Sequence, residues 1–187
     1  MKRPTPLPGL ETPGRIAAAC ALGTGIEAAV AWRFGWSPAL PAYCYFGVAA
    51  AVISMTDLGT RRVPNRVVLP AYLAGPALLA LASALSGSWW PLGRGGIAMA
   101  LLAGFYLLLG LAFPAGMGFG DVKWAGVIGL YLGWLAWTTV STGTLIAFLA
   151  AAVFVTARHL LAGRGWRIVP MAPFMSAGAL VGVLITR

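Results

Sequence analysis

Apolar residues dominate seven long blocks of this chain, separated by short stretches rich in charged residues, glycine or proline. Each block approaches the roughly 20 residues that an α-helix needs to cross a bilayer. The blocks are apolar on all sides, and they lack the alternation of membrane-spanning β-strands. The pattern predicts an all-α, polytopic integral membrane helix bundle, with spans at 15–34, 39–57, 66–86, 95–113, 121–138, 141–158 and 169–186.

The boundary between the fifth and sixth blocks carries no charged residue. The stretch 121–158 could therefore cross the membrane once, which would give six spans instead of seven. At the other end of the chain, residues 1–14 hold four prolines and two glycines and predict an irregular lead-in. The remainder, 15–187, is expected to form a single transmembrane domain.

Composition supports a location in the lipid bilayer. Sixty per cent of the residues are hydrophobic, nine per cent are charged, and the mean hydropathy is +0.86. A soluble domain of this size would need more polar surface than this chain contains. The two cysteines, Cys20 and Cys44, lie in apolar blocks without a C-x-x-C spacing, so we expect buried thiols and no zinc site.

The net charge of +9 is explained by membrane topology, and we expect no nucleic-acid partner. With the N-terminus in the cytoplasm, three cations fall outside: Arg33, Arg94 and Arg187. The other ten fall on the cytoplasmic side, as the positive-inside rule requires. They are Lys2, Arg3, Arg15, Arg61, Arg62, Arg66, Lys123, Arg158, Arg164 and Arg167.

Tryptophans and small residues fit the same arrangement. Most tryptophans fall near predicted outer ends, and Trp124 and Trp166 fall near inner ends, which is typical of an aromatic belt. Two glycine pairs have the spacing that lets helices pack closely: Gly129 with Gly133, and Gly178 with Gly182.

Glu27 lies in the middle of the first block, and we expect it to be protonated or hydrogen-bonded to a neighbouring helix.

Two aspartates are the strongest chemical signal in this acid-poor chain. Asp57 and Asp121 each lie at the edge of an apolar block, where a carboxylate is costly. Two spans separate them, so both are expected on the cytoplasmic face at similar depth. Two carboxylates held close share a proton, and such a pair can activate water while polarising a carbonyl. This chemistry hydrolyses an amide and involves neither a metal nor another cofactor.

Each aspartate also has a simpler interpretation. Asp121 could cap the helix that begins there, and Asp57 could pair with Arg61 or Arg62. The glycines Gly116, Gly118 and Gly120 would allow positive φ and a close approach of substrate backbone. Because both aspartates occur in unusual local sequences, we favour the catalytic interpretation.

These local sequences resemble the motifs of the bacterial type IV prepilin peptidases, a family of membrane aspartyl proteases. Gly116-Met117-Gly118-Phe119-Gly120-Asp121-Val122-Lys123 is similar to the family's G-x-G-D-x-K signature. Asp57 precedes a Pro64-Asn65 pair by seven residues, as in the family's other aspartate motif. Met171-Ala172-Pro173-Phe174 is similar to a late element, and the resemblance runs from about residue 40 to the C-terminus.

The resemblance implies a specific activity and specific site residues. The enzyme would cleave the basic leader from prepilins or pilin-like precursors at the cytoplasmic side of the bacterial inner membrane. Asp57 and Asp121 would be the catalytic pair, and the site would be shaped by Gly118, Gly120, Lys123, Pro64 and Asn65. Many relatives carry a cytoplasmic loop with paired cysteines that is associated with N-methylation. Here about four residues, 35–38, join the first two spans, so the chain resembles a short, peptidase-only form.

Two other functions remain open from the sequence. A proton-coupled transporter or channel could use the aspartates as a relay, although no repeat typical of transporters is visible. A non-catalytic pilus-assembly protein descended from a peptidase could retain the same fold.

Overall fold

The described part of the chain folds into a bundle of seven α-helices. The computed structural model describes residues 12–113, 118–162 and 170–186, apart from the side chains of Arg15 and Ala162. The described residues form no strand, which confirms the predicted all-α fold. The helices are α1 Pro13–Phe34, α2 Leu40–Thr60, α3 Asn65–Leu85, α4 Trp90–Ala112, α5 Phe119–Leu135, α6 Trp137–Ala162 and α7 Ala172–Ile185.

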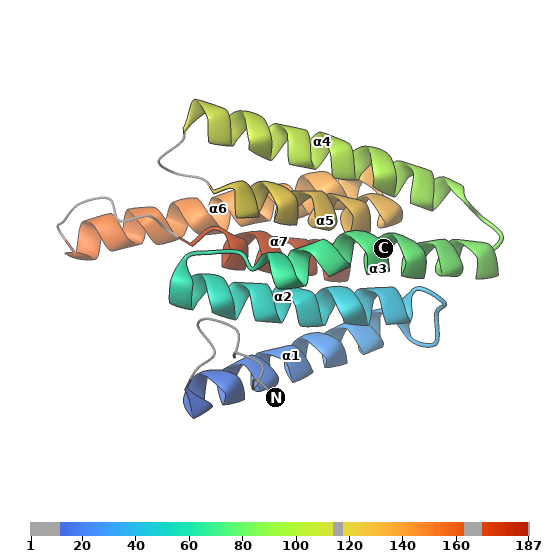
Figure 1. Ribbon diagram of the computed structural model, residues 1–187, viewed down its shortest axis with the longest axis horizontal. Helices are drawn as coiled ribbons and strands as arrows, with labels where there is room; N and C mark the ends of the chain where they lie inside the picture. The colour runs from blue at the N-terminus through green and yellow to red at the C-terminus, as the bar shows by residue number, and fades with distance from the viewer. Residues whose placement is uncertain (1–11, 114–117, 163–169, 187) are drawn as a thin grey trace, which may run out of the picture.

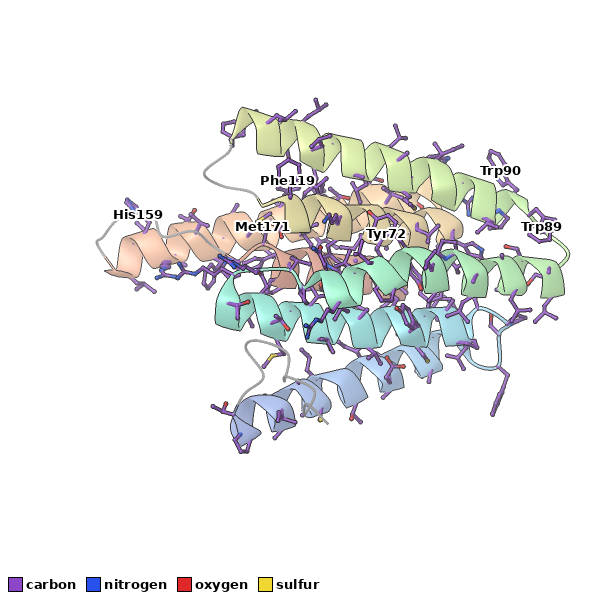
Figure 2. All side chains as sticks on the ribbon, viewed as in Figure 1. Tyr72, Trp89, Trp90, Phe119, His159 and Met171 are labelled. Carbon is purple, nitrogen blue, oxygen red and sulfur yellow. The ribbon has the colours of Figure 1, made fainter. Side chains whose placement is uncertain are left out.

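Consecutive helices run in opposite directions along the bundle (Figure 1). At one end, on the left of the view, α2, α4 and α6 finish and α1, α3, α5 and α7 begin. We call this the aspartate end, because Asp57 lies in the last turn of α2 and Asp121 in the first turn of α5. Figure 2 places Phe119 and Met171 at this end and Trp89 and Trp90 at the opposite end.

Among the residues that the structure describes, five helices are long and apolar enough to cross a membrane: α1, α2, α3, α4 and α6. Two helices are shorter, with 17 residues in α5 and 14 in α7. The stretch predicted to cross either once or twice forms two helices, because Ala136 adopts an extended conformation and ends α5. The chain is thus a multi-pass membrane protein, and its described residues form seven helices.

Helix α5 forms the centre of the bundle. It packs against α3, α4, α6 and α7, and every residue from 124 to 133 is buried. Such a helix must be apolar on all sides, which explains why its sequence has no amphipathic stripe. The prediction that Trp124 belongs to an aromatic belt is therefore wrong. The Trp124 ring is fully buried, and its indole N–H donates to Ser176 Oγ at 3.0 Å. Trp166 lies outside the described residues.

Glycines allow the central helices to approach closely, as predicted. Gly129 and Gly133 of α5 lie against Ala98 of α4, and Gly178 of α7 lies against Gly143 of α6. A Cβ atom on any of the first three would overlap the neighbouring helix. Gly182 extends the α7 contact along Gly143 and Thr139. Backbone proximity of this kind is typical of helix pairs in membranes.

Two arginines that the positive-inside rule left unexplained cap the short helices. The Arg94 guanidinium donates to the carbonyls of Gly133, Trp134 and Leu135 at the end of α5, at 2.6, 2.6 and 2.5 Å. Arg33 donates to Thr186 O, just beyond α7, at 2.7 Å. The last carbonyls of a helix have no partner within it, so these cations satisfy them.

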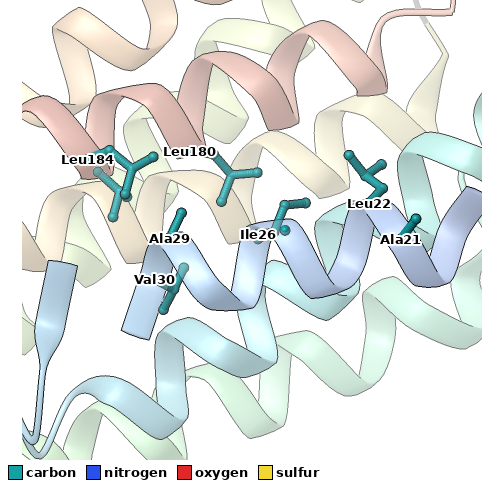
Figure 3. A pocket seen from close by; sticks show the side chains of 9 residues that line it. Ala21, Leu22, Ile26, Ala29, Val30, Leu180 and Leu184 are labelled. Carbon is teal, nitrogen blue, oxygen red and sulfur yellow. The ribbon is translucent and has the colours of Figure 1, made fainter. Parts of the chain in front are cut away.

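Helix α1 packs mainly on α2 and meets α7 only in part. The Glu27 carboxylate lies against Gly47 of α2, beside the Cys44 thiol. Between α1 and α7 runs an apolar groove of about 310 Å³ (Figure 3), and neither Asp57 nor Asp121 lines it. The groove is lined by Ala21, Leu22, Gly25, Ile26, Ala29, Val30, Leu180, Val183 and Leu184.

Candidate active site

Asp57 is buried in the last turn of α2, where 4% of its surface is exposed. Its Oδ2 accepts a hydrogen bond from the Ala172 backbone N–H, at 3.1 Å. Ala172 is the first residue of α7, so the carboxylate faces the amides and positive dipole end of that helix. Arg61 and Arg62 are exposed and form no ion pair with Asp57. The simpler interpretation, in which Asp57 pairs with Arg61 or Arg62, is therefore not supported.

The loop after Asp57 is short and tightly turned. The Arg61 N–H donates to Asp57 O at 2.8 Å, and Arg61 adopts the left-handed conformation with φ of 54°. Pro64 then stands at the N-cap of α3, and its carbonyl accepts the amides of Val67 and Val68 at 3.0 and 3.1 Å. Helix α3 thus begins at Asn65, eight residues after Asp57.

Asp121 lies in the first turn of α5, and one of its oxygens caps that helix. Oδ2 accepts the Gly118 N–H at 3.1 Å, while the Asp121 N–H donates to Gly118 O at 3.0 Å. The capping interpretation is therefore correct for Oδ2. Oδ1 differs: it is buried and accepts no hydrogen bond from the described residues. A buried, unpaired carboxylate oxygen is costly and is available to a ligand or to water.

Direct contacts join the loop that follows Asp57 to the first turn of α5. A Cβ at Gly120 would lie 2.8 Å from the Cβ of Val63, so only glycine fits at this crossing. Lys123 Nζ donates to Asn65 Oδ1 at 3.1 Å. The structure thus brings Gly120, Lys123 and Asn65 together beside the aspartates.

The glycines of the motif act differently from the prediction. Gly118 is extended, with φ of −89°, and neither it nor Gly120 has a positive φ. Positive φ is therefore not the reason for these two glycines, whereas the space required by Val63 explains Gly120. Gly116 and Met117 lie outside the described residues.

The two carboxylates lie close enough for the charge of Asp121 to act on Asp57. They come from α2 and α5, and both lie at the aspartate end of the bundle. Like charges in a desolvated site favour a state in which the pair holds one proton. The arrangement can therefore supply a base and an acid at the same time. Among the described residues, no group of three His, Cys, Asp or Glu side chains is placed to hold a metal ion.

Two site contacts were not predicted from the sequence. The Ala172 amide, which orients Asp57, belongs to the late Met171–Phe174 element, whose role the sequence left undefined. Tyr72 of α3 donates its hydroxyl to Lys123 O at 2.7 Å and so ties α3 to the first turns of α5. For the Asp57–Ala172 contact, the one available sequence signal was Pro173, since proline is common in the first turn of a helix.

Comparison with known protein families matches residues 44–157 to the type IV leader peptidase family. The matched region contains both aspartates and runs from α2 into α6. No curated protein and no solved structure matches the chain.

Proposed function

Because the chain belongs to the type IV leader peptidase family, we propose that it is a membrane aspartyl endopeptidase. Its substrates are prepilins or pilin-like precursors, from which it removes the short basic leader at the cytoplasmic face of the bacterial inner membrane. The observation that carries this proposal is the juxtaposition of two acidic groups, Asp57 and Asp121, at one end of an otherwise apolar bundle.

The proposed reaction uses the aspartate pair with its single proton. The ionised carboxylate takes a proton from a water molecule, and the water oxygen attacks the carbonyl carbon of the scissile peptide bond. The protonated carboxyl donates its proton to the carbonyl oxygen. The C–N bond then breaks: the departing nitrogen takes a proton from one carboxyl group, and a hydroxyl group of the tetrahedral intermediate returns a proton to the other carboxylate, so the pair again holds one proton. The products are the leader, with a new carboxylate, and the mature subunit, with a new amine.

The surrounding residues hold the two carboxylates for this reaction. The Ala172 amide orients Asp57, and the Gly118 amide orients Asp121, each through one carboxylate oxygen. In this proposal Gly120 permits close contact between the loop after Asp57 and the first turn of α5. The Lys123–Asn65 hydrogen bond holds α5 and the start of α3 in this contact. Pro64 starts α3 directly after the loop and limits the freedom of that loop.

The connections at the aspartate end support a peptidase-only enzyme. Segments 61–64, 113–118 and 163–171 are short and contain no cysteine, unlike the cytoplasmic loop associated with N-methylation. We therefore propose leader cleavage without methyl transfer.

The proposal is tested by leader removal in proteoliposomes. The substrate is a precursor with a basic leader, a glycine and a long apolar helix. Asp57→Asn and Asp121→Asn should each abolish cleavage, because asparagine cannot take or donate the catalytic proton but can still accept the helix amide. Glu27→Gln, which changes the other acidic residue within the described part of the chain, is the matched control and should cleave normally.

Retained cleavage in either aspartate variant would remove that residue from the mechanism. If no variant and no wild-type protein cleaves, but proton flux across the same liposomes depends on both aspartates, the transporter interpretation replaces the peptidase.

A further inference from the structure

Helix α4 packs antiparallel along α5 in a register that several contacts define. Ala103 of α4 lies opposite Gly126 of α5, where an added Cβ would be 3.4 Å from the Ala103 Cβ. One turn further along α4, Leu107 shares a cavity of about 30 Å³ with Val122 of α5. Residue numbers therefore increase along α4 in the direction in which they decrease along α5. Tyr106, which lies between the two contacts, is level with the first turns of α5.

Tyr106 is a buried hydroxyl-bearing side chain, with 2% of its surface exposed. Its ring stacks on Phe148 of α6, with centroids 5.7 Å apart, and meets the edge of Phe105 at the same separation. Aromatic contacts from two helices thus fix the ring. A tyrosine held in this way usually directs its hydroxyl at a partner.

Asp121, adjacent to Val122, supplies an acceptor for that hydroxyl. Its Oδ2 is occupied by the Gly118 amide, whereas its Oδ1 is buried and accepts no hydrogen bond from the described residues. The charge of Asp121 also acts on the Tyr106 hydroxyl, so the two groups lie within electrostatic range of each other.

We propose that Tyr106 is a positioning residue for Asp121: the Tyr106 hydroxyl donates to a water molecule that in turn donates to Asp121 Oδ1. The carboxylate is then held at both oxygens, by a backbone amide on one and by the tyrosine-bound water on the other. A carboxylate oxygen has two acceptor positions, so Oδ1 retains one for the water that is activated. This inference rests on the proposed peptidase function.

Tyr131 provides an internal comparison. It is fully buried, its hydroxyl makes no hydrogen bond with the described residues, and its ring, like that of Tyr106, stacks on an aromatic neighbour, here Phe46. Its hydroxyl lies against Gly75 of α3, however, and neither aspartate acts on it. Removal of the Tyr131 hydroxyl therefore makes the same chemical change at a site without a catalytic carboxylate.

The first test measures kcat and KM for precursor cleavage by wild-type protein, Tyr106→Phe and Tyr131→Phe. Tyr106→Phe retains the ring and its stacking, so the bundle should keep its thermal stability. We expect its kcat to fall roughly ten- to hundredfold, the effect of a lost hydrogen bond to a charged group, with KM unchanged. Tyr131→Phe should match the wild type. An unchanged kcat in Tyr106→Phe, or an equal loss in Tyr131→Phe, would overturn the proposal.

The second test does not depend on catalysis. The chain has four acidic residues, so its carboxylate stretching bands in the infrared spectrum are few. The band lost in Asp121→Asn should shift in Tyr106→Phe and stay in place in Tyr131→Phe. A band that does not move in Tyr106→Phe refutes the positioning role. If the wild type fails to cleave but the band shifts as expected, the proposed function fails while the Tyr106–Asp121 interaction stands.

Discussion

At the scale of single residues, the missing side chain at Gly120 allows the two aspartate-bearing segments to meet. Val63, in the loop that follows Asp57, occupies the space where a Cβ of residue 120 would lie. The contact is between backbone and a β-branched side chain, and neither can move without shifting its segment. The distance between the two carboxylates therefore depends on this one position.

Gly120→Ala should separate the two segments and strongly reduce cleavage. The added methyl overpacks the crossing, which costs about 1–3 kcal/mol of stability. Stability in detergent and leader cleavage are measured together. Gly104→Ala, at a position where a Cβ would meet nothing within 4 Å, is the control and should be neutral or slightly stabilising.

A second substitution at the Val63–Gly120 contact should reverse part of the effect of Gly120→Ala. Val63→Gly in the Gly120→Ala background removes the Cβ and the methyl groups that the new Cβ meets, and it should restore part of both stability and cleavage. If Gly120→Ala alone behaves like wild type, the contact does not control the site.

At the scale of elements, α5 and α7 are short, and arginines of neighbouring helices donate hydrogen bonds to the carbonyls at their C-terminal ends. Both helices end inside the bundle, where their last carbonyls need donors. Arg94 supplies three hydrogen bonds to α5, and Arg33 supplies one to α7. The opposite ends of these two helices carry the groups that hold the aspartates, so the caps contribute to the stability of the site's scaffold.

Arg94→Ala should destabilise the bundle more than Arg33→Ala does. Leaving part-buried carbonyls without a donor costs about 1–3 kcal/mol, and Arg94 serves three of them. Unfolding by titration with a denaturing detergent measures the difference. Arg62→Ala, which removes an exposed guanidinium, should change stability by less than about 0.5 kcal/mol. Equal losses for Arg94→Ala and Arg62→Ala would contradict the capping role.

At the scale of the whole molecule, the sequence predicted the helices well because bilayer thickness sets their length. Each predicted span corresponds to one observed helix, and the even number of crossings between Asp57 and Asp121 correctly placed both at one end. The belt assigned to Trp124 failed because four helices surround α5, and a single sequence does not reveal which helix is central.

Long-range contacts were beyond sequence reasoning for a related reason. The Asp57–Ala172 hydrogen bond joins residues 115 positions apart, and its formation depends on where α7 packs between α2, α5 and α6. The free Oδ1 of Asp121 was equally hidden, since an aspartate in a first helical turn usually indicates a cap. The roles of Lys123, Pro64 and Asn65 in catalysis stay predictions.

The central claim is that Asp57 and Asp121 act as one unit, and a double-mutant cycle on cleavage tests it most directly. The rate of leader removal is measured for wild-type protein, Asp57→Asn, Asp121→Asn and the double variant. If the pair shares one proton, either single change removes the mechanism, and the double variant should retain the same residual rate as each single variant. Losses that add in the double variant, or a wild-type rate in either single variant, would contradict the claim.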